Sequence, residues 1–140
     1  MDIQDPEALD AFFAGHDDSR RIFDALQQAV EALGETEIRV SKSQVAFRRK
    51  RVFAAAWRPE QYLGAGRPPL VLTVALRRRD GSTRWKEVVE PARGRFTHHL
   101  ELHAPSEVDG QVRGWLREAW EKAAPPPGRA GKAVEADEED

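Results

Sequence analysis

Two kinds of apolar periodicity divide the chain and restrict the folds open to it. Between residues 36 and 102, apolar side chains recur at every second position in several short runs, which is typical of strands with one buried face. On either side of this region apolar residues recur at three- and four-residue steps, as in amphipathic helices. Because the strands are grouped between helices and do not alternate with them, we predict an α+β domain with a mainly antiparallel sheet of about five strands.

Start signals place three helices around this sheet. Asp5-Pro6-Glu7 is typical of a helix start, and a second start follows at Asp17. After the strands, Ser106 and Asp109 resemble a capping box ahead of a C-terminal helix. We therefore expect two N-terminal helices and one C-terminal helix, all on one face of the sheet.

The chain of 140 residues is long enough for one domain, which we expect over residues 1–124. Residues 125–140 contain prolines, glycines and acids with little to bury, so we expect a disordered acidic tail. The absence of cysteine excludes disulfides and thiolate zinc sites. No apolar run approaches the ~20 residues of a membrane helix, and the acidic N-terminus does not resemble a signal peptide. These features predict a cytoplasmic protein that does not enter the membrane.

Several predicted strands carry residues of functional interest. Arg49-Lys50-Arg51 is predicted to form a charged hairpin tip, and the apolar run from Leu70 to Leu76 a central strand covered on both faces. Further strands are expected from Trp85 to Val89 and from Arg95 to Leu102. Alternation along the first of these two puts Trp85 and Glu87 on one face.

Four sequence blocks carry a resemblance to a known family. The chain resembles, over roughly residues 9–124, a family of small bacterial domains known only as a domain of unknown function. The resemblance implies a shared fold and no established activity. The blocks that carry it are Ser41-Lys42, Phe47-Arg48-Arg49, Trp85 through Pro91, and Gly94 through Leu102.

Charge is strongly segregated along the chain. Residues 1–38 contain ten acids and two bases, whereas residues 39–95 contain fifteen bases and four acids. If the basic residues converge on the helix-free face of the sheet, they would suit phosphate groups, which guanidinium binds bidentately, and tryptophans could stack on nucleic-acid bases. We therefore hypothesise a non-catalytic module that binds nucleic acid or a phosphorylated ligand. The expected contacts are Arg39, Lys42, Arg48, Arg49, Arg51 and Arg84, with Trp57 and Trp85 as stacking surfaces or pocket walls.

An alternative is that these charges have a structural role and bind no ligand. Arginines on exposed strands discourage edge-to-edge aggregation and can pair with acidic helices. Basic and acidic surfaces could also meet on a partner, which makes a protein-interaction domain with weak charge-driven self-association a further alternative.

The remaining alternative is a small enzyme or small-molecule pocket centred on His99, Glu101 and Glu87, since imidazole beside carboxylate is a usable acid–base pair. Adjacent strand residues point to opposite faces, so His98 and His99 cannot bind one metal together. His98 shares a face with apolar residues and is predicted to be a hydrogen-bonded core histidine. The sequence contains no phosphate-binding loop, dinucleotide or zinc-protease motif, so we expect neither cofactor nor metal.

Overall fold

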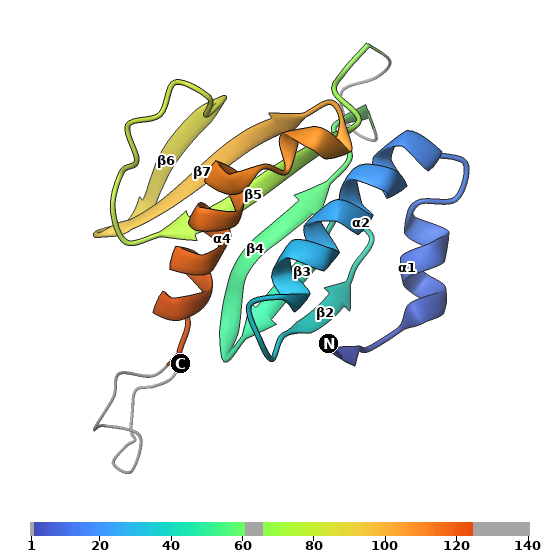
Figure 1. The fold of residues 1–140 in the computed structure, drawn as a ribbon, viewed down its shortest axis with the longest axis horizontal. Helices are drawn as coiled ribbons and strands as arrows, with labels where there is room; N and C mark the ends of the chain where they lie inside the picture. Colours follow the sequence, from blue (N-terminus) through green and yellow to red (C-terminus); the bar gives the residue numbers. More distant parts are fainter. Residues whose placement is uncertain (1, 61–65, 125–140) are drawn as a thin grey trace.

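The computed structural model describes residues 2–60 and 66–124, which form helices packed on one twisted sheet (Figure 1). Within these residues the sheet has seven strands in the order β1-β2-β3-β4-β5-β7-β6. The helices are α1 (Pro6–Phe12), α2 (Asp17–Glu31), the 3-10 turn η1 (Pro105–Glu107) and α4 (Gly110–Lys122). The strands are β1 (Asp2–Ile3), β2 (Glu37–Val40), β3 (Val45–Arg49), β4 (Arg51–Trp57), β5 (Leu70–Leu76), β6 (Glu87–Ala92) and β7 (Arg95–Leu102).

The predicted α+β class is confirmed, but the strand count of about five was wrong. One strand that the sequence did not predict is β1, which has two residues and pairs in parallel with β2. Two residues are too short to give a period-two pattern, and this pairing exists only because the chain returns to that edge after α2. The other neighbouring strands pair antiparallel, so the sheet is mixed.

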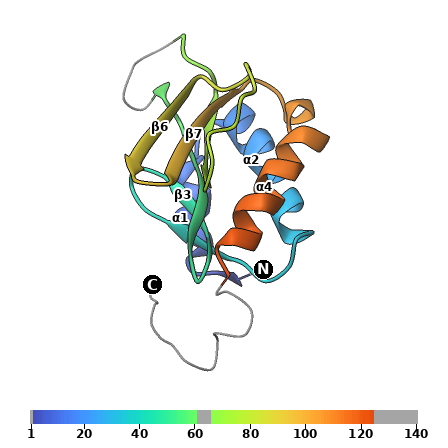
Figure 2. The ribbon, with the colours of Figure 1, turned by 90° about the vertical axis from the view of Figure 1, so that its left-hand side faces the viewer.

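The helices do not all cover the sheet in the same way. In Figure 2, α2 and α4 lie together on one side of the sheet, and α1 lies beside the β2 end in Figure 1. Asp5 caps α1 as expected, accepting a hydrogen bond from the Ala8 amide at 3.0 Å. The prediction that Ser106 and Asp109 form a capping box was wrong. Ser106 lies in η1, and Asp109 is itself the N-cap of α4.

The core lies between the helices and one face of the sheet. A chain of aromatic contacts crosses it from Phe13 through Phe23 and Phe47 to Phe53, with ring centroids 5.1 to 6.4 Å apart. Phe53 occupies a register shift between β3 and β4, since Phe47 pairs with Ala54 and Arg48 pairs with Val52. This extra residue lets Phe53 join the core beside Ala54.

Trp85 does not belong to the predicted strand. β6 begins at Glu87, and Trp85 precedes it with 8% of its surface exposed. Its ring packs against Trp115 and His98, with centroids 4.1 and 4.7 Å away. Burial of the large indole against α4 therefore overrides the alternation expected from local sequence.

β5 was expected to be a central strand covered on both faces. It is central in the sheet, but the described helices cover one of its faces, not both.

The predicted acidic tail, 125–140, lies outside the described residues. Within the described part of the chain, no helix is both long enough and apolar enough to cross a bilayer.

Candidate anion-binding site

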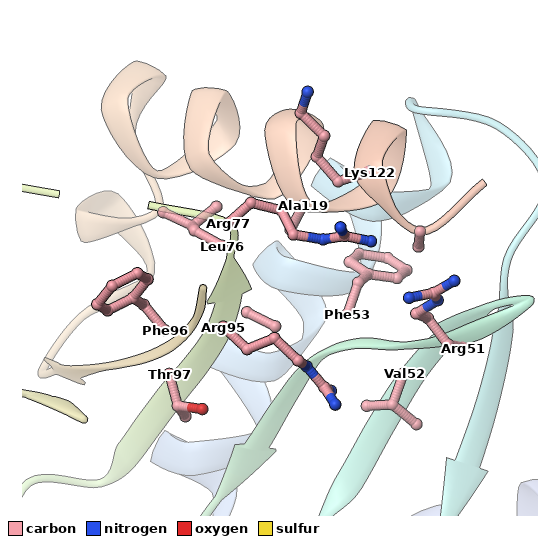
Figure 3. Close-up of a pocket in the computed structure, with 12 residues that line it drawn as sticks. Arg51, Val52, Phe53, Leu76, Arg77, Arg95, Phe96, Thr97, Ala119 and Lys122 are labelled. Carbon is pink, nitrogen blue, oxygen red and sulfur yellow. The ribbon is translucent and has the colours of Figure 1, made fainter. Parts of the chain in front are cut away.

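Four basic residues from four segments line a pocket at one end of the sheet (Figure 3). β5 runs antiparallel to both β4 and β7, so its carboxyl end lies beside the amino ends of these neighbours. Arg77 follows β5 directly, whereas Arg51 and Arg95 begin β4 and β7. Lys122 ends α4, which packs over β4 and β5. The topology thus gathers cations that are far apart in the sequence.

The pocket combines a cationic rim with an apolar floor. Its volume is about 40 Å³, and Phe53, Leu76 and Phe96 contribute to its lining. No carboxylate is among the described residues that line it. In Figure 3 the arginine side chains extend over the pocket, whereas the amine of Lys122 points away from it. An anion bound here would meet guanidinium groups beside apolar surface, where solvent screens charges less than in bulk water.

The three consecutive arginines after β5 have different surroundings. Arg77 lines the pocket, and Arg79 lies over the ring of Phe96 at 5.4 Å from its centroid. Arg78 turns to α4, where its Nε and Nη2 donate to the Glu118 carboxylate at 2.9 and 2.8 Å. These hydrogen bonds to Glu118, with a further one to Asp80, raise the pKa of Arg78. Of these three arginines, only Arg77 lines the pocket.

The arginines expected on the helix-free face are held by a carboxylate. Arg39 and Arg48 approach the same Glu37 oxygen at 3.5 and 3.2 Å. One carboxylate thus offsets part of their charge, and neither residue lines the pocket. Lys42 lies in the bend between β2 and β3, also away from the pocket.

Arg49 projects to the opposite side from Arg48. Its guanidinium lies 3.5 Å from the Trp120 ring centroid, and its Nη1 donates to the Trp120 carbonyl oxygen at 3.1 Å. This pair joins the β3–β4 hairpin to the end of α4. Of the predicted contacts that the structure describes, Arg51 alone lines the pocket.

Arg84 and Trp85 lie at the other end of α4. Arg84 Nη1 donates to both Asp109 oxygens at 3.1 and 3.0 Å, and to Gln111 at 2.9 Å. The hydrogen bond from the Val112 amide, together with Arg84, lowers the pKa of Asp109. Trp85 is buried in the core and therefore does not form a wall for a ligand in this conformation.

The helix-free face carries a row of polar residues across three strands. Trp57 Nε1–H donates to Thr73 Oγ1 at 3.2 Å, and Thr73 Oγ1 lies 2.9 Å from His99 Nδ1. Glu87 is the register partner of His99 on the other side. Burial lowers the pKa of His99, and the charge of Glu87 offsets part of this effect. Glu101 pairs with Val71, one step further along the same face.

His98 is a buried, hydrogen-bonded core residue, as predicted. It is fully buried, its Nε2 accepts from the Asp80 amide at 3.0 Å, and its Nδ1 faces the Phe96 carbonyl oxygen at 3.3 Å. These partners fix the proton on Nδ1. Burial lowers the pKa of His98, so the neutral form is favoured. No group of three or more His, Cys, Asp or Glu side chains suited to a metal occurs among the residues described.

The pocket residues were not selected from the sequence, apart from Arg51. Arg77 and Arg95 stood out only as members of the basic region, and Lys122 lies in a helix outside it. Their common position depends on strand order and register, which no local pattern reveals.

Comparison with known proteins gives a family but no activity. The model of one family, described as Domain of unknown function (DUF5655), matches residues 9–123. No match was found among curated proteins or among solved structures. The resemblance to an uncharacterised domain family is thereby confirmed, and the chain belongs to the family described as Domain of unknown function (DUF5655).

Proposed function

We propose that this domain is a non-catalytic module that binds a compact phosphate-bearing ligand at the pocket between β4, β5, β7 and α4. The observation that carries the proposal is that Arg51, Arg77 and Arg95, from three separate segments, line one pocket that has no carboxylate among its described lining residues. Other arginines approach carboxylates, as Arg39 and Arg48 do at Glu37 and Arg78 does at Glu118.

Chemistry and size both favour phosphate. A guanidinium offers paired N–H donors that match two phosphate oxygens. At ~10–15 Å³ for each water that a cavity holds, the pocket of about 40 Å³ has room for roughly three waters, close to one phosphoryl group. The tryptophans expected to stack on bases, Trp57 and Trp85, do not line it. A compact ligand is therefore favoured over an extended nucleic-acid strand.

The proposal is tested by titrating the ¹⁵N-labelled full chain with inorganic pyrophosphate and following amide shifts. We expect shifts at Phe53, Thr97 and Ala119, which line the pocket. The double variant R77A/R95A should bind at least tenfold more weakly, because each charge-assisted hydrogen bond contributes ~1.5–3 kcal/mol. The matched control R39A/R48A removes the same charge from the helix-free face and should bind within about twofold of the parent.

Pyrophosphate that shifts no pocket amide, or that binds R77A/R95A as well as the parent, would overturn the proposal. A second titration distinguishes a small phosphate ligand from a nucleic-acid backbone. It uses short labelled single- and double-stranded DNA and RNA at two salt concentrations. Tighter binding of an oligonucleotide than of pyrophosphate, with a steep salt dependence, would assign the site to a nucleic-acid backbone.

A second candidate is a small-molecule site on the helix-free face at His99. The observation in its favour is the hydrogen bond between Thr73 and His99. Because the Trp57 indole can only donate to Thr73, the hydroxyl hydrogen of Thr73 is available to His99 Nδ1. This leaves a neutral imidazole with its N–H on Nε2, beside Glu87 and with Glu101 on the same face. A ligand whose affinity changes with pH in the parent and not in H99A would support this candidate, and identical ligand screens would remove it.

A further inference from the structure

The residues that follow Arg77 fix the loop that carries it to the pocket. Arg77 begins the loop between β5 and β6 and lines the pocket. In Figure 3 its side chain extends beneath α4. A long arginine side chain loses rotamer freedom when it binds a ligand, so a backbone that is already held in place lowers the cost of binding. The contacts that hold this loop therefore bear on how well the pocket binds an anion.

Arg78 attaches the loop to α4. Its Nε and Nη2 donate to the two carboxylate oxygens of Glu118 at 2.9 and 2.8 Å, and its Nη1 donates to Asp80 at 2.8 Å. Two parallel hydrogen bonds fix orientation as well as distance. The Arg78 and Glu118 side chains are 49% and 28% exposed, and an ion pair this accessible adds little to global stability. Its main effect is therefore local.

Glu118 lies beside the wall of the pocket. Residues three and four apart on a helix share a face, and Glu118 precedes Lys122 by one turn of α4. Ala119 and Lys122 both line the pocket. On the other side of the ion pair, Arg78 directly follows Arg77. The pair thus joins the segment that carries Arg77 to the helix that forms the wall.

The next two residues hold the loop to β7. Arg79 lies over the ring of Phe96 at 5.4 Å from its centroid, and Phe96 lines the pocket. The Asp80 amide donates to Nε2 of His98 at 3.0 Å. Residues 78–80 are therefore tied to α4 on one side and to β7 on the other, directly after the pocket arginine.

We propose that the ion pair between Arg78 and Glu118 positions Arg77 at the pocket, so that Glu118, although an acid, promotes the binding of an anion. The inference rests on the proposed function for the identity of the ligand. The restraint on the loop can be measured without any ligand.

The variant E118Q tests the proposal by the sign of its effect. A carboxylate near an anion site opposes binding through its charge, so by electrostatics alone E118Q should bind pyrophosphate more tightly than the parent. If Glu118 acts by positioning Arg77, E118Q should bind about three- to tenfold more weakly, the range expected when one long side chain must be ordered on binding. Glutamine and glutamate have similar helix propensity, so α4 should remain intact.

The matched control is E121Q, which removes the same charge from an exposed position in the last turns of α4 and leaves Arg78 paired. It should bind pyrophosphate within about twofold of the parent. A double-mutant cycle then separates positioning from charge. In the R78Q background, E118Q should change affinity no more than E121Q does, because the partner through which Glu118 acts is gone. An equal loss of affinity from E118Q with and without Arg78 would overturn the proposal.

Nuclear relaxation of the ¹⁵N-labelled full chain supplies the measurement without ligand. We expect greater picosecond–nanosecond motion at the Arg77 and Arg79 amides in E118Q and no change in E121Q. Unchanged motion in E118Q would reject the restraint on the loop.

The outcomes separate the two proposals. If the parent binds pyrophosphate and E118Q binds it as tightly or more tightly, the positioning role is rejected while the proposed function stands. Greater loop motion in E118Q, with no pyrophosphate binding by the parent, supports the restraint on Arg77 and rejects the proposed function.

Discussion

Trp85 donates a hydrogen bond from its indole Nε1–H to the carboxylate of Asp80 at 2.8 Å. The Asp80 amide in turn donates to His98, which packs against the Trp85 ring. Burial alone would raise the pKa of Asp80, but the hydrogen bonds from Trp85, Ser82 and Arg78 outweigh it and lower the pKa to about 2. The three residues fix the loop between β5 and β6 to the core.

Replacing this indole removes a donor to a mostly buried carboxylate. We expect W85F to lower the free energy of unfolding by about 1–3 kcal/mol beyond the loss of ring volume, measured by urea denaturation at pH 7. The control is W115F, which trims the neighbouring ring in the same stack. Equal losses in the two variants would show that the hydrogen bond to Asp80 contributes little.

Stability should fall on mild acidification because of His98. Its pKa in the folded state is lowered by burial, so between that value and the unfolded value of ~6.5 the unfolded chain binds more protons. The contribution is complete above the unfolded pKa and is lost as pH falls towards the folded pKa. His99 acts with the same sign. Urea denaturation from pH 7.5 to 5 should show the decline, with a shallower slope in H98Q than in the parent.

Gly34 makes room for Trp120. An added Cβ would lie 2.7 Å from the Trp120 Cζ2 atom, at a backbone φ of +141° that side chains disfavour. We expect G34A to cost about 2–4 kcal/mol, because strain and a clash with a packed ring add together. Gly15 has a φ of +79° but open space around the added Cβ, so G15A should cost only about 1 kcal/mol. If G34A and G15A lowered the denaturation midpoint equally, a clash with the Trp120 ring would not be the cause.

Asp109 both caps α4 and holds Arg84. Its Oδ1 accepts from the Val112 amide at 3.1 Å. We expect D109A to lower stability by about 1–2 kcal/mol, as for other N-cap losses. D109N keeps a capping oxygen and loses only the charge, so most of the stability should return. Thermal unfolding of both variants distinguishes these roles, and an equally destabilised D109N would place the main contribution in the pair with Arg84.

The sequence predicted the elements whose signals are local. α2 begins at Asp17 and its apolar stripe supplies core residues, as the three- and four-residue spacing predicts. The hairpin tip at Lys50 has a φ of +65°, consistent with the tight turn expected between two charged strand ends. These features depend on interactions within a few residues, so period and turn chemistry suffice to find them.

The tertiary structure decided where the charged side chains gather. Neighbouring Arg48 and Arg49 point to opposite sides, to Glu37 and to Trp120. The pocket depends instead on the adjacency of β4, β5 and β7, where β7 lies beside β5 although β6 comes between them in the chain. Local alternation gives each side chain a face, but only strand order and register bring distant residues to one end of the sheet. The sequence by itself therefore determined the class of fold and a basic region, and long-range pairing selected which of those bases form a site.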